Sequence, residues 1–162
     1  MRSSIIIFIL VLISFENWAH CEKPSKFIKA NKKEGWAEST QSRAGYLKFN
    51  ETYEMVFIAQ KDMEYLLSFG SNLKALNSQI DFLIYEKVVV KVEENGSKVY
   101  RKIDNVLYDS KKSNSPSEMT FVNRETRKLY LTISLPNPSS KNRNPCVGVL
   151  IEHKRALKLW LD

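Results

Sequence analysis

The chain has 162 residues, 43% of them hydrophobic, and a net charge of +7, which suits one domain with a single core. It contains only two histidines, two cysteines and five glycines, a poor basis for a zinc site, a disulfide-stapled miniprotein or a glycine-rich phosphate loop. We therefore expect neither a metal nor a cofactor. The lysines are spread among glutamates, which predicts a solvated basic surface with a non-specific attraction to an anionic envelope or glycan.

Residues 1–21 have the features of an export signal. Arg2 precedes the apolar run Ile5–Ile13, which is too short to cross a bilayer as a helix and fits a secretory signal. The protein is therefore expected to be exported, to the periplasm, the cell surface or the medium. Export also argues against a nucleic-acid partner.

The cleavage site decides the state of the cysteines. Cleavage after Ala19 keeps Cys21, which would then be free to form a disulfide with Cys146, whereas cleavage after Cys21 leaves Cys146 alone. In a third arrangement Cys21 carries a lipid, although residues 18–20 lack the small side chains of a lipoprotein signal. Lipidation or an uncleaved signal would attach the protein to a membrane.

The next segment, residues 22–45, is polar. We expect a short helix near Phe27–Lys33, ended by Gly35. The densest lysine cluster, Lys26–Lys33, has four lysines, with Phe27 as its one aromatic residue. The segment is predicted to lie outside the folded domain, which we place at residues 46–155.

From residue 46 the apolar residues alternate with polar ones, which is typical of β-strands. Strands are expected over 52–60 and 63–70, joined by a tight hairpin turn at Lys61-Asp62. Asn95-Gly96 is the strongest hairpin signal, pairing Lys87–Glu93 with Lys98–Asp104. The alternating charges of that ribbon predict that it projects with one face in water.

Three further strands complete the pattern. They are expected at 118–122, at 127–135 and from Cys146 to about Lys154, separated by polar loops at 111–116 and 136–145. About eight short antiparallel strands with almost no helical pattern predict an all-β sandwich of jelly-roll or immunoglobulin-like type. Residues 156–162 form a C-terminal tail.

Catalytic candidates are few. Cys146 and His153 are seven residues apart on one strand, so they lie on opposite faces and about 23 Å apart, too far for a nucleophile and its base. Acids such as Glu54, Glu64 and Asp81 alternate with apolar residues and are expected to face solvent, although paired carboxylates would be enough for a glycosidase. We predict no catalytic residues and no enzyme.

Aromatic residues offer one binding alternative. In a β-sandwich, exposed rings can stack on sugars, and packing in the core is the competing interpretation. The candidates for stacking are Trp36, Tyr85, Tyr100 and Tyr108.

An ordered series of segments resembles a group of small exported proteins from Bacteroidetes: FNETYEMVFIAQKDMEYLLSF, IDFLIYEK, IDNVLYD, TRKLYLTISLP and NPCVGVLIEHK. The resemblance covers roughly residues 30–155. It implies a signal peptide followed by one β-sandwich domain, and it transfers no functional residues because that family is functionally uncharacterised.

These observations favour a non-enzymatic exported β-sandwich that binds another macromolecule, either an envelope protein or a glycan. A carbohydrate-binding module with exposed aromatic residues is the alternative, and a small glycosidase or lyase is the third hypothesis. The sequence leaves the oligomeric state open.

Overall fold

The computed structural model describes residues 21–31, 35–94, 96–113, 117–135 and 145–157. In these ranges nine strands form two antiparallel sheets, which confirms the predicted all-β sandwich. Apart from Cys21, the expected signal lies outside the described residues. No helix in the described ranges is long and apolar enough to cross a membrane.

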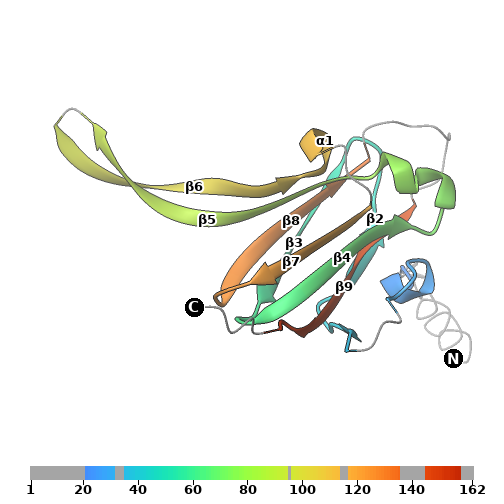
Figure 1. The fold of residues 1–162 in the computed structure, drawn as a ribbon. Coiled ribbons are helices and arrows are strands. Elements are labelled where there is room, and N and C mark those ends of the chain that lie inside the picture. The colour runs from blue at the N-terminus through green and yellow to red at the C-terminus, as the bar shows by residue number, and fades with distance from the viewer. Residues whose placement is uncertain (1–20, 32–34, 95, 114–116, 136–144, 158–162) are drawn as a thin grey trace, which may run out of the picture.

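Sheet A has five strands and sheet B has four (Figure 1). In sheet A, β9 lies between β4 and the two short strands β1 and β2, and β7 forms the far edge. The strands of sheet A are β1 (Ala37–Glu38), β2 (Arg43–Tyr46), β4 (Met63–Ser71), β7 (Glu118–Asn123) and β9 (Cys146–Arg155). Sheet B has the order β3-β8-β5-β6, with β3 (Thr52–Ala59), β5 (Asp81–Glu94), β6 (Ser97–Asp109) and β8 (Arg127–Ser134).

The core lies between the two sheets and is built mainly from alternate residues of β3, β4, β5, β8 and β9. Leu67 and Ile151 from sheet A and Leu129 from sheet B are completely buried. Phe69 and Phe82 stack across the core with ring centroids 3.7 Å apart. Each such large apolar side chain stabilises the fold by about 2 kcal/mol through burial.

The predicted turn at Lys61-Asp62 is present, but the prediction of a hairpin there is wrong. β3 pairs with β8 in sheet B, whereas β4 pairs with β7 and β9 in sheet A. The turn therefore carries the chain from one sheet to the other. Asp62 has a positive φ of 59°. Phe57, before the turn, and Tyr65, after it, both face the core, and their ring centroids are 5.9 Å apart.

The hairpin predicted at Asn95-Gly96 is confirmed. Lys87 is opposite Asp104 and Glu93 is opposite Lys98, as expected, and Gly96 has a positive φ of 74°. The last contact of β5 with β8 is Tyr85 opposite Tyr130, so beyond this point the hairpin has no neighbouring strand and projects from the sandwich (Figure 1). We call residues 86–94 and 97–106 the arm.

The arm is more exposed than expected, because the whole stretch of β6 from 97 to 106 is solvent-exposed.

The N-terminal segment differs most from expectation. Residues 27–31 are not helical, and a 3₁₀ turn, η2 (Pro24–Lys26), precedes them instead. β1 and β2 both pair with β9, so the sandwich begins before residue 46. The remaining helical pieces are η3 (Lys74–Gln79) and α1 (Ser110–Ser113).

Candidate functional site

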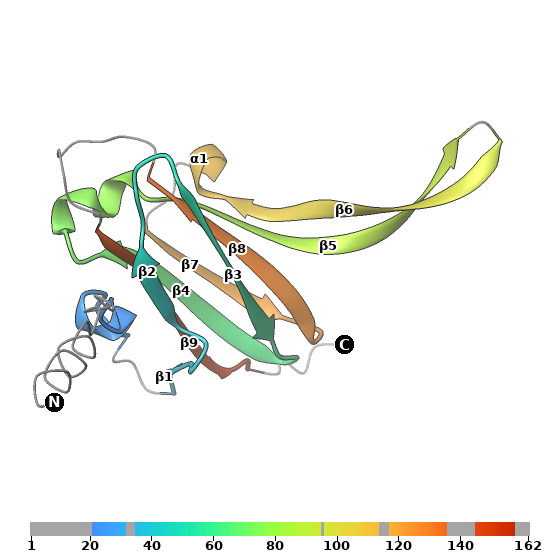
Figure 2. The same cartoon turned by 180° about the vertical axis from the view of Figure 1, so that it is seen from behind.

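Over β4 and β9 the outer face of sheet A is covered by the N-terminal segment (Figure 2), whereas the outward residues of β7 are exposed. Ile28 is 8% exposed and packs on Gly70 of β4, where an added Cβ would lie 2.8 Å from Cγ1 of Ile28. Further along, the Nζ atom of Lys154 lies 4.7 Å from the centroid of the Trp36 ring. This face is therefore largely closed to a partner.

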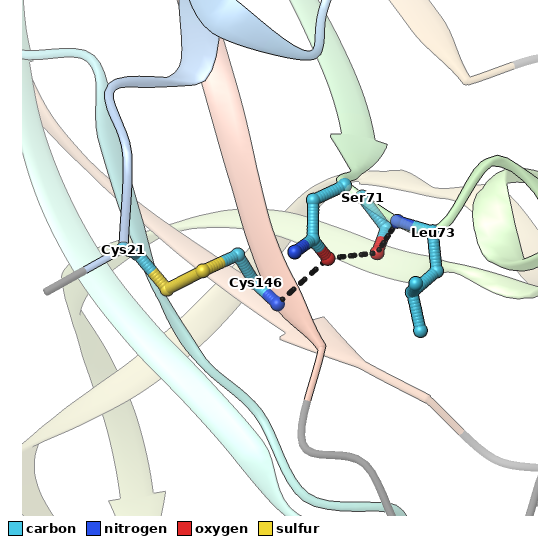
Figure 3. The surroundings of a disulfide bond; sticks show 5 residues. Cys21, Ser71, Leu73 and Cys146 are labelled. Atoms are coloured by element: carbon cyan, nitrogen blue, oxygen red, sulfur yellow. Dashed lines mark hydrogen bonds between the residues drawn. A yellow bond between two sulfur atoms is a disulfide. The ribbon is translucent and has the colours of Figure 1, made fainter. Parts of the chain in front are cut away.

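A disulfide between Cys21 and Cys146 fastens the start of this cover to β9 (Figure 3). The backbone N–H of Cys146 donates to Oδ1 of Asn72 at 3.1 Å, and the N–H of Leu73 donates to Oγ of Ser71. These bonds fix the start of β9 against the end of β4. A cross-link between residues 125 positions apart restricts the unfolded chain strongly, by about 4 to 5 kcal/mol in the chain-entropy model.

Cys146 and His153 do not form a catalytic pair. Cys146 faces the covered side of sheet A and its sulfur is in the disulfide. His153 faces the core side and is paired with Tyr65 of β4. The centroids of the two rings are 6.0 Å apart. A nucleophile and base on opposite faces of one strand have no reactive contact.

Glu152 is the one carboxylate among the described residues that is fully buried, with 2% of its surface exposed. Its side-chain oxygens accept the backbone N–H of Asn31 at 2.9 and 3.1 Å. Burial raises the pKa of Glu152, and the N–H of Asn31 partly opposes this effect. Because the carboxyl group lies beneath the N-terminal cover, it is placed to hold that cover and not to meet a substrate.

The outer face of sheet B, in contrast, is open. Val56 and Ile58 of β3 point outward and are 40% and 43% exposed. Tyr130 and Lys128 are opposite them on β8. We call this surface, with the outward residues of β5, the open face.

At the centre of the open face two tyrosines from neighbouring strands stack, Tyr85 and Tyr130, with ring centroids 5.2 Å apart. Tyr85 donates its hydroxyl to Oε2 of Glu54 at 2.5 Å. This bond and burial raise the pKa of Tyr85 to about 12. The Nζ atoms of Lys87 and Lys128 lie 4.5 and 5.1 Å from the Tyr130 centroid, within the range of a cation–π contact.

No ion pair joins Lys87 or Lys128 to a carboxylate in the described part of the chain. The centre of the open face therefore presents two lysines and the Glu54 carboxylate around two stacked tyrosines. Apolar side chains beside charged groups are typical of a surface that contacts a partner.

A pocket of about 250 Å³ lies at one end of the open face, and Asp81, Asp109 and Lys111 are among its lining residues. It is the arrangement closest to the paired acids of a glycosidase. The Nζ of Lys111 lies 3.2 Å from Oδ2 of Asp81, and Lys112 pairs with Asp109. Both acids are thus engaged with lysines of α1.

The outward side of the arm continues the open face, because Tyr85 is opposite Val106 in the same row. Val89 and Tyr100 are 67% and 68% exposed on this side. They alternate with charged residues: Lys87, Lys91, Glu93, Lys98, Lys102 and Asp104.

The four aromatic residues predicted to stack on a ligand do not form one exposed cluster. Trp36 lies over the outer face of sheet A, and Tyr108 stacks on the core residue Phe82. Tyr100 is exposed on the arm, and Tyr85, 5% exposed, is covered within the open face.

Tyr85 was among the predicted stacking residues, whereas its partner Tyr130 was not. Alternation along 127–135 does place Tyr130 and Lys128 on the same face. It does not show that the strand of Tyr85, 45 positions earlier in the chain, is the neighbour of this strand. No group of three or more metal-binding side chains occurs among the described residues.

No protein-family model, curated protein or solved structure matches the chain. The resemblance to exported Bacteroidetes proteins therefore stays a prediction, and the surfaces described above are the basis of the functional argument.

Proposed function

We propose that this chain is an exported, non-enzymatic protein of the periplasm or cell envelope that binds another macromolecule through the open face. The observation that carries the proposal is the difference between the two outer faces. The N-terminal segment covers β4 and β9 of sheet A, whereas Val56 and Ile58 keep the outer face of sheet B apolar and exposed. Exposed apolar residues beside the two lysines and Glu54 suit a protein surface with apolar and charged groups.

The Cys21–Cys146 disulfide supports export, since disulfides persist mainly in oxidising compartments. It also bears on processing. A chain that carries this bond must retain Cys21, so cleavage would precede that residue. The sulfur in the disulfide has no capacity for a lipid, which favours a protein without a lipid anchor at this position.

The geometry favours a macromolecule over a sugar or a small substrate. The candidate aromatic residues are dispersed and build no shared platform for stacking. The pocket of about 250 Å³ on the open face lies below the usual range of small-molecule sites, roughly 300 to 1,000 Å³. The larger hollows, of about 520 and 460 Å³, lie beside the N-terminal segment and not on the open face. A flat, extended sheet face is better suited to a protein than to a buried ligand.

A photo-crosslinking amino acid at Val56 tests the proposal, in the full chain expressed with its export signal. We expect it to capture an envelope macromolecule that mass spectrometry identifies. The matched control is Val122 of β7, which is 54% exposed at the edge of sheet A. Equal products from both positions would contradict binding at the open face.

The partner identified in this way is then bound to purified variants. Val56→Glu together with Ile58→Glu should weaken binding by at least about tenfold, since two desolvated carboxylates would oppose the contact. Val122→Glu should leave binding unchanged. Turnover of a glycan or ester panel by the purified protein, abolished by Asp81→Asn, would instead establish an enzyme.

A further inference from the structure

The edge of β6 is the longest unprotected strand edge in the described part of the chain. It runs for 13 residues, from Ser97 to Asp109, and ten of these are exposed. Edge strands present a row of free N–H and C=O groups that readily pair with another strand. A hairpin without neighbouring strands is also only marginally stable in water.

The other edges of the sandwich are shorter or occupied. β7 has six residues. On β3, the side chain of Gln41 accepts the N–H of Ile58 at 2.8 Å and donates to its carbonyl oxygen at 3.2 Å. The edge of β3 is thus partly occupied from within the chain, whereas that of β6 is not.

We propose that the β6 edge pairs with the β6 edge of a second copy of this chain. Two identical antiparallel strands are related by a two-fold axis perpendicular to the sheet, so each residue faces one residue of the partner on the same side. Like charges directly opposite each other destabilise such a pair, and opposite charges stabilise it. The sequence of residues 97–106 can therefore be tested register by register.

Four two-fold registers pair seven or more residues of this stretch. Three of them place like charges opposite each other: Lys98 against Lys102, Arg101 against Arg101, or Lys102 against Lys102. The fourth is centred on Ile103 and has no such conflict.

In the register centred on Ile103, the two copies of Ile103 meet at the axis. Lys102 of each copy is opposite Asp104 of the other copy, which gives one such pair on each side of the axis. Tyr100 of each copy is likewise opposite Val106 of the other. These side chains are among the exposed ones of the arm: Tyr100 68%, Ile103 44% and Val106 49%. The pairing would remove them from water and match every charge that it brings together except Arg101, which is opposite the neutral Asn105.

The free edge of β5 is a weaker candidate. Every two-fold register that pairs seven or more residues of 86–94 opposes Lys87 to Lys91, Glu86 to Glu94, or Lys91 to itself. In addition, Glu86 is already paired with Arg127 of β8 at 3.3 Å. Charge complementarity therefore selects β6.

The geometry of this dimer has a consequence for the proposed binding surface. Because the axis is perpendicular to the sheet, the open faces of both copies lie on the same side. The two four-stranded sheets would join into one continuous eight-stranded face.

Sedimentation velocity of the mature, disulfide-bonded protein tests the proposal. We expect a reversible dimer with a Kd on the order of micromolar, since such a small interface is weak. Lys102→Asp and Asp104→Lys should each raise the Kd about tenfold or more, because each change opposes two pairs of like charges. The double change, Lys102→Asp with Asp104→Lys, should restore dimerisation.

Lys91→Asp is the matched control, because it changes an exposed lysine of the arm on β5 and should leave the Kd unchanged. A wild-type protein that stays monomeric up to hundreds of micromolar would overturn the proposal. If neither single charge reversal changes the Kd, the dimer does not form through the β6 edge. If the double change does not restore dimerisation, the register centred on Ile103 is wrong.

A second measurement does not depend on charge reversal. With Ile103→Cys the introduced thiols face each other across the axis and should give a covalent dimer on oxidation. With Tyr100→Cys the thiols would be about 20 Å apart along the strands and should not. Equal cross-linking of both variants, or none, would contradict the register. A monomeric protein would not contradict binding at the open face, because Val56 lies on β3, at the opposite edge of sheet B from β6.

Discussion

The two outer faces of this sandwich are made from similar strands, yet one is covered and the other is open. On sheet A the outward side chains of β9, Leu150 and Glu152 among them, are buried under or beside the N-terminal residues. On sheet B the outward residues of β3 remain exposed. A polar terminal segment with a buried isoleucine, a backbone N–H bonded to a buried carboxylate and a disulfide thus covers β4 and β9.

Removing the disulfide is the strongest test of this difference. Cys21→Ser with Cys146→Ser should lower the free energy of unfolding by about 2 to 5 kcal/mol, measured by urea denaturation. Hydrogen exchange should also increase at residues 22–31 and stay unchanged on β3. Equal loss of protection on both sheets would mean that the bond stabilises the fold as a whole and not the cover.

Two isoleucines provide a matched pair for the next test. Ile28→Ala removes a side chain that is 8% exposed, and Ile58→Ala removes one that is 43% exposed. We expect losses of about 2 to 4 kcal/mol and less than about 1 kcal/mol, respectively, because only the first leaves a cavity. Similar losses from chemical denaturation of both variants would show that the cover contributes no more than the open face.

Glu152 should make the cover sensitive to pH. Since burial raises its pKa, the folded state binds the proton more tightly than the unfolded state. Its contribution is therefore complete below the ordinary glutamate pKa and is lost as pH rises through the raised value. Glu152→Gln should remove this loss and raise stability near neutral pH by about 1 kcal/mol. Thermal unfolding at several pH values measures it.

Glu125→Gln is the control for that experiment, because Glu125 is an exposed acid between β7 and β8 and does not contribute to the raised pKa of Glu152. An unchanged pH profile in the Glu152 variant would show that the buried carboxyl group does not contribute to the pH dependence.

Tyr85 gives the smallest expected effect, on the open face. Its raised pKa of about 12 means that its contribution is complete below the ordinary value of 10.0 and is lost as pH rises from there through 12. Glu54→Gln should lower the pKa of Tyr85 towards 10.0, because the negative charge that accepts the hydroxyl proton is gone. Ultraviolet titration of tyrosinate compares this variant with the wild type, and identical curves would contradict the bond.

The strands from residue 52 onward could be predicted because alternation requires no knowledge of partners, whereas β1 and β2 were not predicted. The Asn95-Gly96 hairpin also follows from local turn chemistry. Pairing across the sandwich could not be predicted in the same way. The turn at Lys61-Asp62 suits a hairpin and a passage between sheets equally well, and only the packing of distant strands decides between them.

The candidate surfaces illustrate the same limit. Ile28 is one apolar residue in a polar segment, so no periodicity marks it as a contact of Gly70. Tyr85 and Tyr130 become neighbours only when β5 and β8 pair. The outward residues of each strand of the open face could therefore be predicted, but their arrangement as neighbours on one surface could not.

The bonds from Gln41 to Ile58 have a further consequence for solubility. A single glutamine side chain bonds one N–H and one C=O of the β3 edge, as the backbone of a neighbouring strand would. With the β3 edge obstructed and pairing at the β5 edge opposed by like charges, sheet B has one side available for growth, and two-fold pairing at β6 occupies that side. Association of this kind ends at two molecules, whereas a sheet with two free edges could add copies without limit and form fibres.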